Sequence, residues 1–362
     1  MTELKYANDT RVSGYDPLIA PSMLIHEQPV SETAKQVIAQ GRLDAANVIN
    51  GRDDRLLVVV GPCSIHDPTQ AKEYAQKLYA AYASCWKDGL VLVMRAYFEK
   101  PRTTVGWKGL INDPDLNGSF QINRGLRVAR QLLLDLTEIG LPVGCEVLDT
   151  ISPQYLSDLY SWGAIGARTT ESQLHRELVS GLSMPVGFKN STDGGIGVAI
   201  DAIRASSCPH SFIGVTSQGL AAIVKTTGNS DLHIIHRGGN TGTNYDAESI
   251  QTSKAGLRKV LPDRHPSIMV DASHGNSQKD YRNQPKGAEA VAQQIEAGED
   301  AITGLMIESH INEGKQSEPK AGCADELAHG VSITDACISL ETTFQLLDRL
   351  NSAVLKRRAA RK

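Results

Sequence analysis

The feature of this sequence that most restricts its fold is a regular alternation between short apolar runs and segments with helical spacing. The apolar runs are rich in β-branched residues, as buried strands are, and they cover 56–60, 91–96, 141–148, 164–168, 185–189, 211–216, 232–237, 267–272 and 301–309. Helical spacing lies between most of them, at 68–86, 125–140, 152–163, 248–261 and 287–298. Strands that alternate with helices predict an α/β protein with a parallel sheet.

The number of strands favours a closed barrel. Residues 211–229 contain two short β-like runs around a turn with glycine, which indicates an inserted β-hairpin. Without this segment eight strands remain over roughly 250 residues, the usual size of a (β/α)8 TIM barrel. A doubly wound open sheet is the alternative, because strand order cannot be read from one sequence. We predict a (β/α)8 TIM barrel with an N-terminal extension and an inserted β-hairpin.

The rest of the chain divides around this barrel. Residues 1–50 are predicted to form an N-terminal arm with one helix within 31–50, residues 51–350 the barrel, and residues 351–362 a basic tail whose end, 356–362, is frayed and solvated. The arm carries apolar side chains outside the barrel pattern, namely Leu18, Ile19, Met23 and Leu24. Burying them against a second subunit would give a homodimer or a homotetramer.

Charge and hydropathy exclude several classes of function. With 37 basic and 41 acidic residues the formal net charge is −4, which argues against general binding of nucleic acid or of an anionic membrane. No apolar run reaches the length of about 18 residues needed to span a bilayer, and the first residues resemble neither a signal nor a transit peptide. We therefore expect a cytoplasmic protein without a nucleic-acid or membrane partner.

Cations follow many of the predicted strands, where catalytic groups of TIM barrels lie. Any one of them could be a solvated charge or an ion-pair partner. Together they predict an anionic ligand that offsets their repulsion, because arginine matches carboxylate and phosphate oxygens in pairs. Hydroxyls from Thr103, Thr104, Thr169 and Thr170 would add donors. The cations are Arg95, Lys100, Arg102, Arg168, Lys189 and Arg237.

Candidate metal ligands lie at the same strand ends. Cys63 follows the first strand, His274 the seventh and Glu308 the eighth, while Asp335 comes before the last helix. Each has a structural alternative, such as a buried thiol or a loop histidine, and spacing alone does not decide between them. A thiolate, an imidazole and two carboxylates would suit manganese, iron, cobalt or zinc better than magnesium.

Long motifs carry a resemblance to a known family. GPCSIHD (61–67), MRAYFEKPRTTVGWKGLINDP (94–114), the run 162–194, RGG (237–239), SHGNS (273–277), IES (307–309) and GVSITDAC (330–337) resemble the class I 3-deoxy-D-arabino-heptulosonate 7-phosphate (DAHP) synthases. The resemblance covers nearly the whole chain after about residue 13. It implies a barrel enzyme with one divalent metal ion per subunit that condenses phosphoenolpyruvate with D-erythrose 4-phosphate. This reaction is the first step of the shikimate pathway to aromatic amino acids.

The resemblance also implies roles for single residues. Cys63, His274, Glu308 and Asp335 would be the metal ligands, and Arg102 and Thr103 would bind the phosphate of the aldose. The residues that would hold phosphoenolpyruvate are Arg95, Lys100, Arg168, Lys189 and Arg237. Lys100, Glu146 and His274 are the predicted catalytic residues, with Glu146 near the attacking water. We expect neighbouring cations to lower the pKa of Lys100, so that it can protonate the aldehyde oxygen, although a metal-bound water could do so instead.

Regulation by an aromatic amino acid is implied in the same way. The candidate effector surface combines the hairpin with residues 180–185, and its predicted contacts are Leu182, Ser183, Phe212 and Val224. The runs 242–249, 273–285 and 304–314 resemble the tyrosine-sensitive members, so tyrosine is the favoured effector. Plain structural packing of the hairpin is the alternative.

Two other functions remain open at the level of sequence. A related barrel could join phosphoenolpyruvate to another phosphosugar, such as arabinose 5-phosphate; the KPRTT run (100–104) argues against this by resemblance. An inactive paralogue could sense an amino acid and regulate a partner. The complete set of metal-ligand candidates argues against this second alternative.

Overall fold

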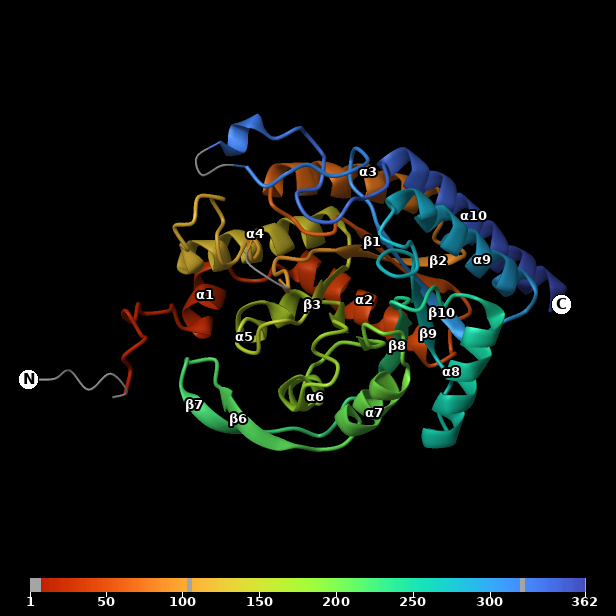
Figure 1. Cartoon of the computed structure of the whole chain (residues 1–362), viewed down its shortest axis with the longest axis horizontal. Helices are drawn as coiled ribbons and strands as arrows, with labels where there is room; N and C mark the ends of the chain where they lie inside the picture. The colour runs from red at the N-terminus through yellow and green to blue at the C-terminus, as the bar shows by residue number, and fades with distance from the viewer. Residues whose placement is uncertain (1–7, 103–105, 320–322, 362) are drawn as a thin grey trace, which may run out of the picture.

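The computed structural model describes residues 8–102, 106–319 and 323–361, and it contains a closed parallel barrel (Figure 1). Around the barrel the strands follow the order β1, β10, β9, β8, β5, β4, β3, β2. This closure confirms the barrel and rules out the open sheet. The barrel strands are β1 (Leu56–Gly61), β2 (Leu90–Arg95), β3 (Val143–Glu146), β4 (Trp162–Ile165), β5 (Val186–Lys189), β8 (Leu232–His236), β9 (Ile268–Asp271) and β10 (Ile302–Glu308).

Helices surround the barrel and connect its strands. They begin at side-chain caps in several cases; Asp67, for example, accepts hydrogen bonds from the first turn of α3. The helix α4 ends at Gly140 in the left-handed conformation that favours glycine. The helices are α1 (Pro21–Glu27), α2 (Glu32–Ile49), α3 (Pro68–Cys85), α4 (Ile122–Ile139), α5 (Pro153–Leu156), α6 (Gln173–Val179), α7 (Gly197–Ser206), α8 (Ala247–Val260), α9 (Gln284–Glu296) and α10 (Leu340–Ala360).

The helix α2 closes the amino-terminal end of the barrel. It starts where the sequence predicted a helix of the arm, with Ser31 as its cap. Its side chains Ala45, Val48 and Ile49 pack into one apolar cluster with interior side chains of the strands, among them Leu57 and Trp162. Because this end is filled, the carboxyl ends of the strands are the end at which loops can form a site.

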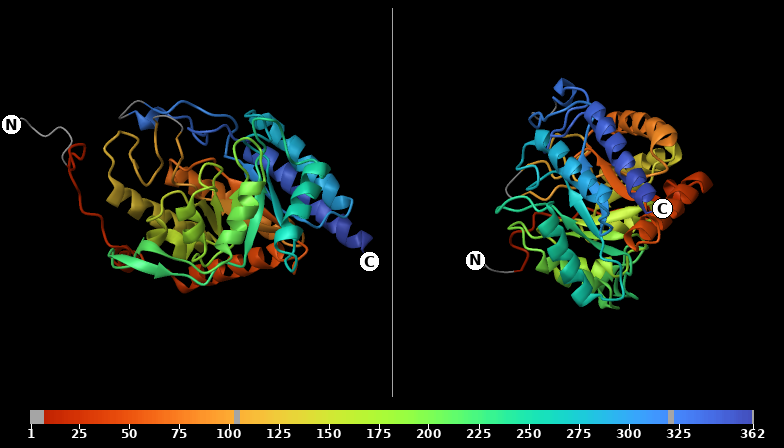
Figure 2. Two further views of the ribbon diagram at one scale, coloured as in Figure 1. Left: turned by 60° about the horizontal axis from the view of Figure 1, so that its bottom comes forward. Right: turned by 90° about the vertical axis from the view of Figure 1, so that its right-hand side faces the viewer.

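The inserted hairpin is confirmed as an antiparallel pair, β6 (Ser211–Val215) and β7 (Ala221–Lys225). Figure 2 shows it on the same side of the molecule as the arm. The Ser22 N–H donates to the Ser217 carbonyl at the hairpin turn. Ile213 and Ile223 are 87% and 74% exposed on this hairpin.

Three expectations from the sequence need correction. The segment 152–163 is only the short helix α5 and a 3₁₀ turn, because the chain already enters β4 at Trp162. The end 356–362 is not frayed up to Ala360: α10 continues there, and the buried Arg357 donates to the carbonyls of Asp54 and Glu299. Leu24 needs no second subunit for its burial, because it is fully buried in the core of its own chain.

The other apolar side chains of the arm differ from Leu24. Leu18 and Met23 are exposed, whereas Ile19 packs partly on the core of its own chain. The division of the chain at residues 50 and 350 stays a prediction. Within the described residues, no helix is both long and apolar enough to cross a membrane.

Candidate active site

A pocket at the carboxyl ends of the strands brings together five of the predicted site residues. Each comes from a different strand or from the loop that follows it, so the fold itself makes them converge. The remaining walls include Pro101, Thr169 and Thr192. The five predicted residues that line the pocket are Glu146, Arg168, Lys189, Arg237 and His274.

Arg95 lies deeper than this pocket, at the end of β2, and is 1% exposed. Its guanidinium lies 3.1 Å from the Glu308 carboxylate and over the ring of Tyr97, 3.9 Å from the ring centroid. Arg95 also donates to the carbonyls of Pro62 and Cys63. These contacts fix the guanidinium against the loop that carries the candidate thiol ligand.

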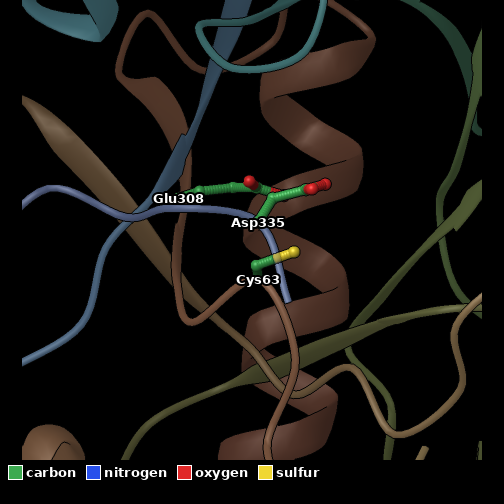
Figure 3. Close-up of side chains that lie close together, drawn as sticks. All are labelled: Cys63, Glu308 and Asp335. Carbon is green, nitrogen blue, oxygen red and sulfur yellow. The ribbon is translucent and has the colours of Figure 1, made fainter. Parts of the chain in front are cut away.

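Three of the four predicted metal ligands form a cluster, with their side chains directed to one side (Figure 3). One donor atom from each of Cys63, Glu308 and Asp335 lies within 4.8 Å of the others. A hydrogen bond of 2.7 Å between the hydroxyls of Ser64 and Thr334 joins the two loops that carry Cys63 and Asp335. This hydrogen bond therefore holds two loops that are far apart in sequence close together at the cluster.

His274, the fourth predicted ligand, lies outside this group of three but close to Glu308. Its Nε2 lies 4.0 Å from Glu308 Oε1, and its Nδ1 lies 2.9 Å from Asp271 Oδ2. A carboxylate behind the second ring nitrogen is a common support of a metal-binding histidine. The residue has a φ of 54°, a conformation unusual for a non-glycine residue that recurs at functional sites.

The chemistry of this donor set fits a divalent metal ion. Burial and the neighbouring Glu308 carboxylate raise the pKa of the Cys63 thiol to about 11, so a strong cation is needed to displace its proton. Burial alone would also raise the pKa of Glu308, but His274, Arg95 and Lys100 lower it. A thiolate, an imidazole and two carboxylates form a set that borderline metal ions prefer.

Lys100 corrects one expectation. Its Nζ lies 3.0 Å from Cys63 Sγ, and its pKa is raised rather than lowered. Burial disfavours the charged ammonium, but the contact with the Cys63 sulfur and the negative charges of Glu308 and Asp335 outweigh that effect. The sequence argument counted the cations that follow the strands, whereas the structure surrounds this ammonium with two carboxylates and a sulfur acceptor.

Asp271, the last residue of β9, was not assigned a role from the sequence. It is fully buried, and its carboxylate lies 2.9 Å from Lys189 Nζ as well as from His274. Burial would raise its pKa, but Lys189 and His274 hold it well below the usual range. Its place at a strand end, three residues before His274, was the available signal.

Gln284 was also missed. Its side-chain amide donates to the Glu308 carbonyl and accepts from the Glu308 N–H, each at 2.9 Å, and thereby fixes the backbone of a candidate metal ligand. Ser273 donates to the second oxygen of the same carboxylate at 2.9 Å. A glutamine at the start of α9 carries no sequence signal for this contact.

Arg102, which was predicted to bind the aldose phosphate, does not line the pocket. Arg102 pairs with Glu318 and donates to the Trp107 carbonyl at 2.8 Å. Thr103 and Thr104 lie outside the described residues.

The predicted effector residues lie on two segments that contact each other, and none of them lines the pocket. Phe212 and Val224 are direct cross-strand partners in the hairpin. The loop with Leu182 and Ser183 contacts the hairpin base, where the hydroxyls of Ser180 and Thr226 lie 2.6 Å apart.

Comparison with known proteins gives a consistent result. Residues 27–348 match the model of the DAHP synthetase I family. The tyrosine-inhibited phospho-2-dehydro-3-deoxyheptonate aldolase of Candida albicans is 58% identical over 98% of this chain and 96% of its own length. The phenylalanine-inhibited aldolase of Saccharomyces cerevisiae is 54% identical over 99% and 97%. The structure of phospho-2-dehydro-3-deoxyheptonate aldolase from Francisella tularensis matches with a TM-score of 0.92 and 46% identity, covering 96% of this chain and 99% of that one.

Proposed function

This chain belongs to the DAHP synthetase I family, and we propose that it acts as a 3-deoxy-7-phosphoheptulonate synthase, a transferase that condenses phosphoenolpyruvate with D-erythrose 4-phosphate to DAHP and inorganic phosphate. The observation that carries the proposal is the convergence of Arg168, Lys189 and Arg237 on one pocket beside the cluster of Cys63, Glu308 and Asp335. Cationic donors and metal ligands side by side suit one anionic substrate and one carbonyl substrate.

Phosphoenolpyruvate is held by the pocket cations. Arg168 and Arg237 offer planar sets of N–H donors that match phosphate and carboxylate oxygens, and Lys189 adds an ammonium from the pocket floor. The buried Arg95 supplies positive charge beneath the site. The predicted role of Arg102 and Thr103 toward the aldose phosphate belongs to this proposal, and for Arg102 it requires that substrate compete with Glu318.

One divalent metal ion, held by Cys63, His274, Glu308 and Asp335, would act as a Lewis acid that polarises the aldehyde oxygen. The donor set would suit manganese, iron, cobalt or zinc better than magnesium. The buried Glu308 is placed for this role by Gln284 and Ser273. Arg95 balances its charge from the opposite side.

The reaction joins C3 of phosphoenolpyruvate to the aldehyde carbon. Lys100, whose raised pKa keeps it protonated near neutral pH, donates its proton to the aldehyde oxygen. The attack of C3 leaves positive charge on C2 of the former phosphoenolpyruvate. Water adds there and loses a proton, which the Glu146 carboxylate that lines the pocket is placed to accept. The resulting hemiketal phosphate loses inorganic phosphate by cleavage of its C2–O bond and leaves the ketone of the product.

Purified protein with both substrates and a divalent metal tests this function. We expect phosphoenolpyruvate to disappear and phosphate to appear in equal amounts, and only when erythrose 4-phosphate is present. Phosphate release without the sugar would identify a phosphatase, and turnover with arabinose 5-phosphate in its place would identify the alternative synthase. Binding of an aromatic amino acid without any turnover would identify the inactive paralogue.

Feedback inhibition by tyrosine at the surface formed by the hairpin and residues 180–185 is part of the proposal. Its support is the 58% identity to a tyrosine-inhibited relative, against 54% to a phenylalanine-inhibited one, together with the contact of the two segments. Steady-state rates with each aromatic amino acid decide the effector. Inhibition by phenylalanine alone would reverse the assignment, and no inhibition would make the hairpin structural.

A homodimer or homotetramer through the arm and the hairpin completes the proposal. Exposed apolar side chains gather on these two segments, among them Tyr15, Leu18, Ile213 and Ile223. Deletion of residues 1–30 should reduce the mass of the particle in sedimentation. An unchanged mass would reject the arm as an interface.

A further inference from the structure

The turn that carries Arg237 is enclosed by three asparagine side chains from three different loops. Asn190 follows β5, Asn244 lies in the loop after β8, and Asn276 lies in the loop after β9. Asn190 and Asn276 are buried, whereas Asn244 is half-buried. Three strand-end loops that are separate in sequence therefore meet at one short piece of backbone, residues 236–238.

Asn190 and Asn244 hold the centre of this turn. Asn190 Oδ1 accepts from the Arg237 N–H at 2.8 Å, and Asn190 Nδ2 donates to the Gly238 carbonyl at 3.0 Å. Asn244 Oδ1 accepts from the Gly238 N–H at 2.8 Å. The two side chains also contact each other, since Asn244 Nδ2 donates to Asn190 Oδ1 at 3.2 Å.

Asn276 holds the two remaining carbonyls of the turn. Its Nδ2 donates to the His236 carbonyl at 3.0 Å and its backbone N–H to the Arg237 carbonyl at 3.2 Å. Its Oδ1 accepts from the Asn244 N–H at 2.8 Å, which connects the third asparagine to the other two. All backbone donors and acceptors from the His236 carbonyl to the Gly238 carbonyl are thus hydrogen-bonded.

Close backbone packing leaves this turn little freedom. Gly238 has a φ of 68°, and a Cβ there would lie 2.5 Å from the Asn276 nitrogen. A Cβ on Gly275 would lie 2.6 Å from the Gly239 nitrogen. The Gly238 carbonyl, fixed by Asn190, also accepts from the Arg237 guanidinium at 3.4 Å. The network therefore fixes the backbone position from which the Arg237 side chain extends. It also fixes the Gly238 carbonyl, which is one acceptor of the guanidinium.

We propose that Asn190, Asn244 and Asn276 form an asparagine clamp that positions Arg237 for the anionic groups of phosphoenolpyruvate. The asparagines are positioning residues, which act through Arg237 and not on the substrate. A pre-fixed guanidinium binds an anion without paying for its own ordering. This inference rests on the proposed role of Arg237 in binding phosphoenolpyruvate.

Asn190→Ala and Asn244→Ala test the clamp in the complete enzyme. Each removes at least two hydrogen bonds of the network, so we expect the KM for phosphoenolpyruvate to rise about tenfold. The KM for erythrose 4-phosphate should change less than about twofold, since Arg237 is not assigned to that substrate. Asn244 is half-buried, so its variant provides a test even if Asn190→Ala does not fold.

Asn50→Ala is the matched control. Asn50 is also half-buried and donates two side-chain hydrogen bonds of 2.8 Å, to the Ala46 carbonyl and to Asp231, but at the opposite end of the barrel. It should lower the Tm as the clamp variants do and leave the KM for phosphoenolpyruvate unchanged. Equal effects of control and clamp variants on KM would overturn the inference.

The variant Arg237→Ala separates the clamp from the proposed function. In that background Asn244→Ala should raise the KM for phosphoenolpyruvate less than about twofold further, because its effect passes through the missing side chain. If Arg237→Ala raises this KM but the asparagine variants do not, the clamp is wrong and the proposed function stands. If Arg237→Ala itself has no effect on KM, the assignment of Arg237 to the substrate fails, and the clamp fails with it.

Discussion

Replacement of Asp271 by asparagine separates the charge of this buried carboxylate from its size. Asp271 is fully buried between Lys189 Nζ and His274 Nδ1, each 2.9 Å away. Asp271→Asn keeps one acceptor oxygen and nearly the same volume. It leaves the Lys189 ammonium, which is only 4% exposed, without its anionic partner. The variant therefore tests whether the pair stabilises the fold and orients the site.

The magnitude follows from the burial of both partners. Removing one member of a buried ion pair lowers the free energy of unfolding by about 3–5 kcal/mol. Because asparagine retains one acceptor oxygen, we expect a loss of about 3 kcal/mol for this variant. A chain of 362 residues has an unfolding entropy of roughly 760 cal/mol/K at about 2.1 cal/mol/K per residue, so the Tm should fall by about 4 °C. Loss of a carboxylate behind a metal-binding histidine should also weaken metal affinity by about 10–100-fold.

Calorimetry of the metal-free protein and titration with manganese measure the two effects separately. Asp300→Asn is the control, because Asp300 also faces a lysine, Lys254 at 3.3 Å, but is half exposed and far from the pocket. An exposed pair of this kind contributes about 0–1 kcal/mol. If Asp271→Asn changes neither the Tm nor the metal affinity more than Asp300→Asn does, the reasoning about the buried carboxylate is refuted.

Three further predictions follow from single contacts. Cys63→Ser should lose tight metal binding and turnover while its circular dichroism spectrum is unchanged; activity that persists after chelation and dialysis would reject the thiol as a ligand. Gly166→Ala would place a Cβ against Glu146 Oε1, so kcat should fall by about 100-fold with little change in Tm, and a normal kcat would speak against the role of Glu146. Burial lowers the pKa of His233 from 6.5 to about 4. Between these pH values the unfolded chain binds more protons than the folded chain, so the free energy of unfolding falls by about 3 kcal/mol as the pH drops from 6.5 to 4. His233→Gln, which can still accept from Trp162 Nε1, should flatten this loss in urea unfolding at pH 7 and pH 4.5, and an equal loss in both proteins would contradict the assignment.

The position of the site could be predicted because strand ends are local features of the sequence. Glu146 and Lys189 are the last residues of β3 and β5, so identifying the strands was enough to place both at one end of the barrel. In the barrel β4 lies between these two strands, and both side chains line the same pocket. The same reasoning placed Cys63 and Glu308 at one end of the barrel. The structure adds that they are close to each other, because β1 pairs with β10 and Gly61 lies opposite Glu308.

Residues that act through the backbone of another loop could not be predicted in this way. Gln284 and Asn190 bind peptide groups far away in sequence, and neither residue type has a spacing that reveals such a partner. The prediction of a frayed end at 356–362 was wrong for a similar reason. A run of basic residues suggests solvated side chains, but Arg357 donates to the carbonyls of Asp54 and Glu299, which are far away in sequence.

The charges at the strand ends need a different explanation from the one that the sequence offered. Counting cations predicted that their mutual repulsion demands an anionic ligand, yet Arg95 faces Glu308, Lys189 faces Asp271, and Arg102 faces Glu318. Anionic substrates are therefore not required to neutralise the folded chain.

An ammonium has three N–H donors, so Lys189 can contact Asp271 and a substrate oxygen together. The internal carboxylate then fixes the direction of the remaining donors before substrate binds, and such preorganised donors bind developing or existing negative charge without further ordering. The argument for an anionic substrate consequently rests on the donors that Arg168, Lys189 and Arg237 present to the pocket, not on an excess of positive charge.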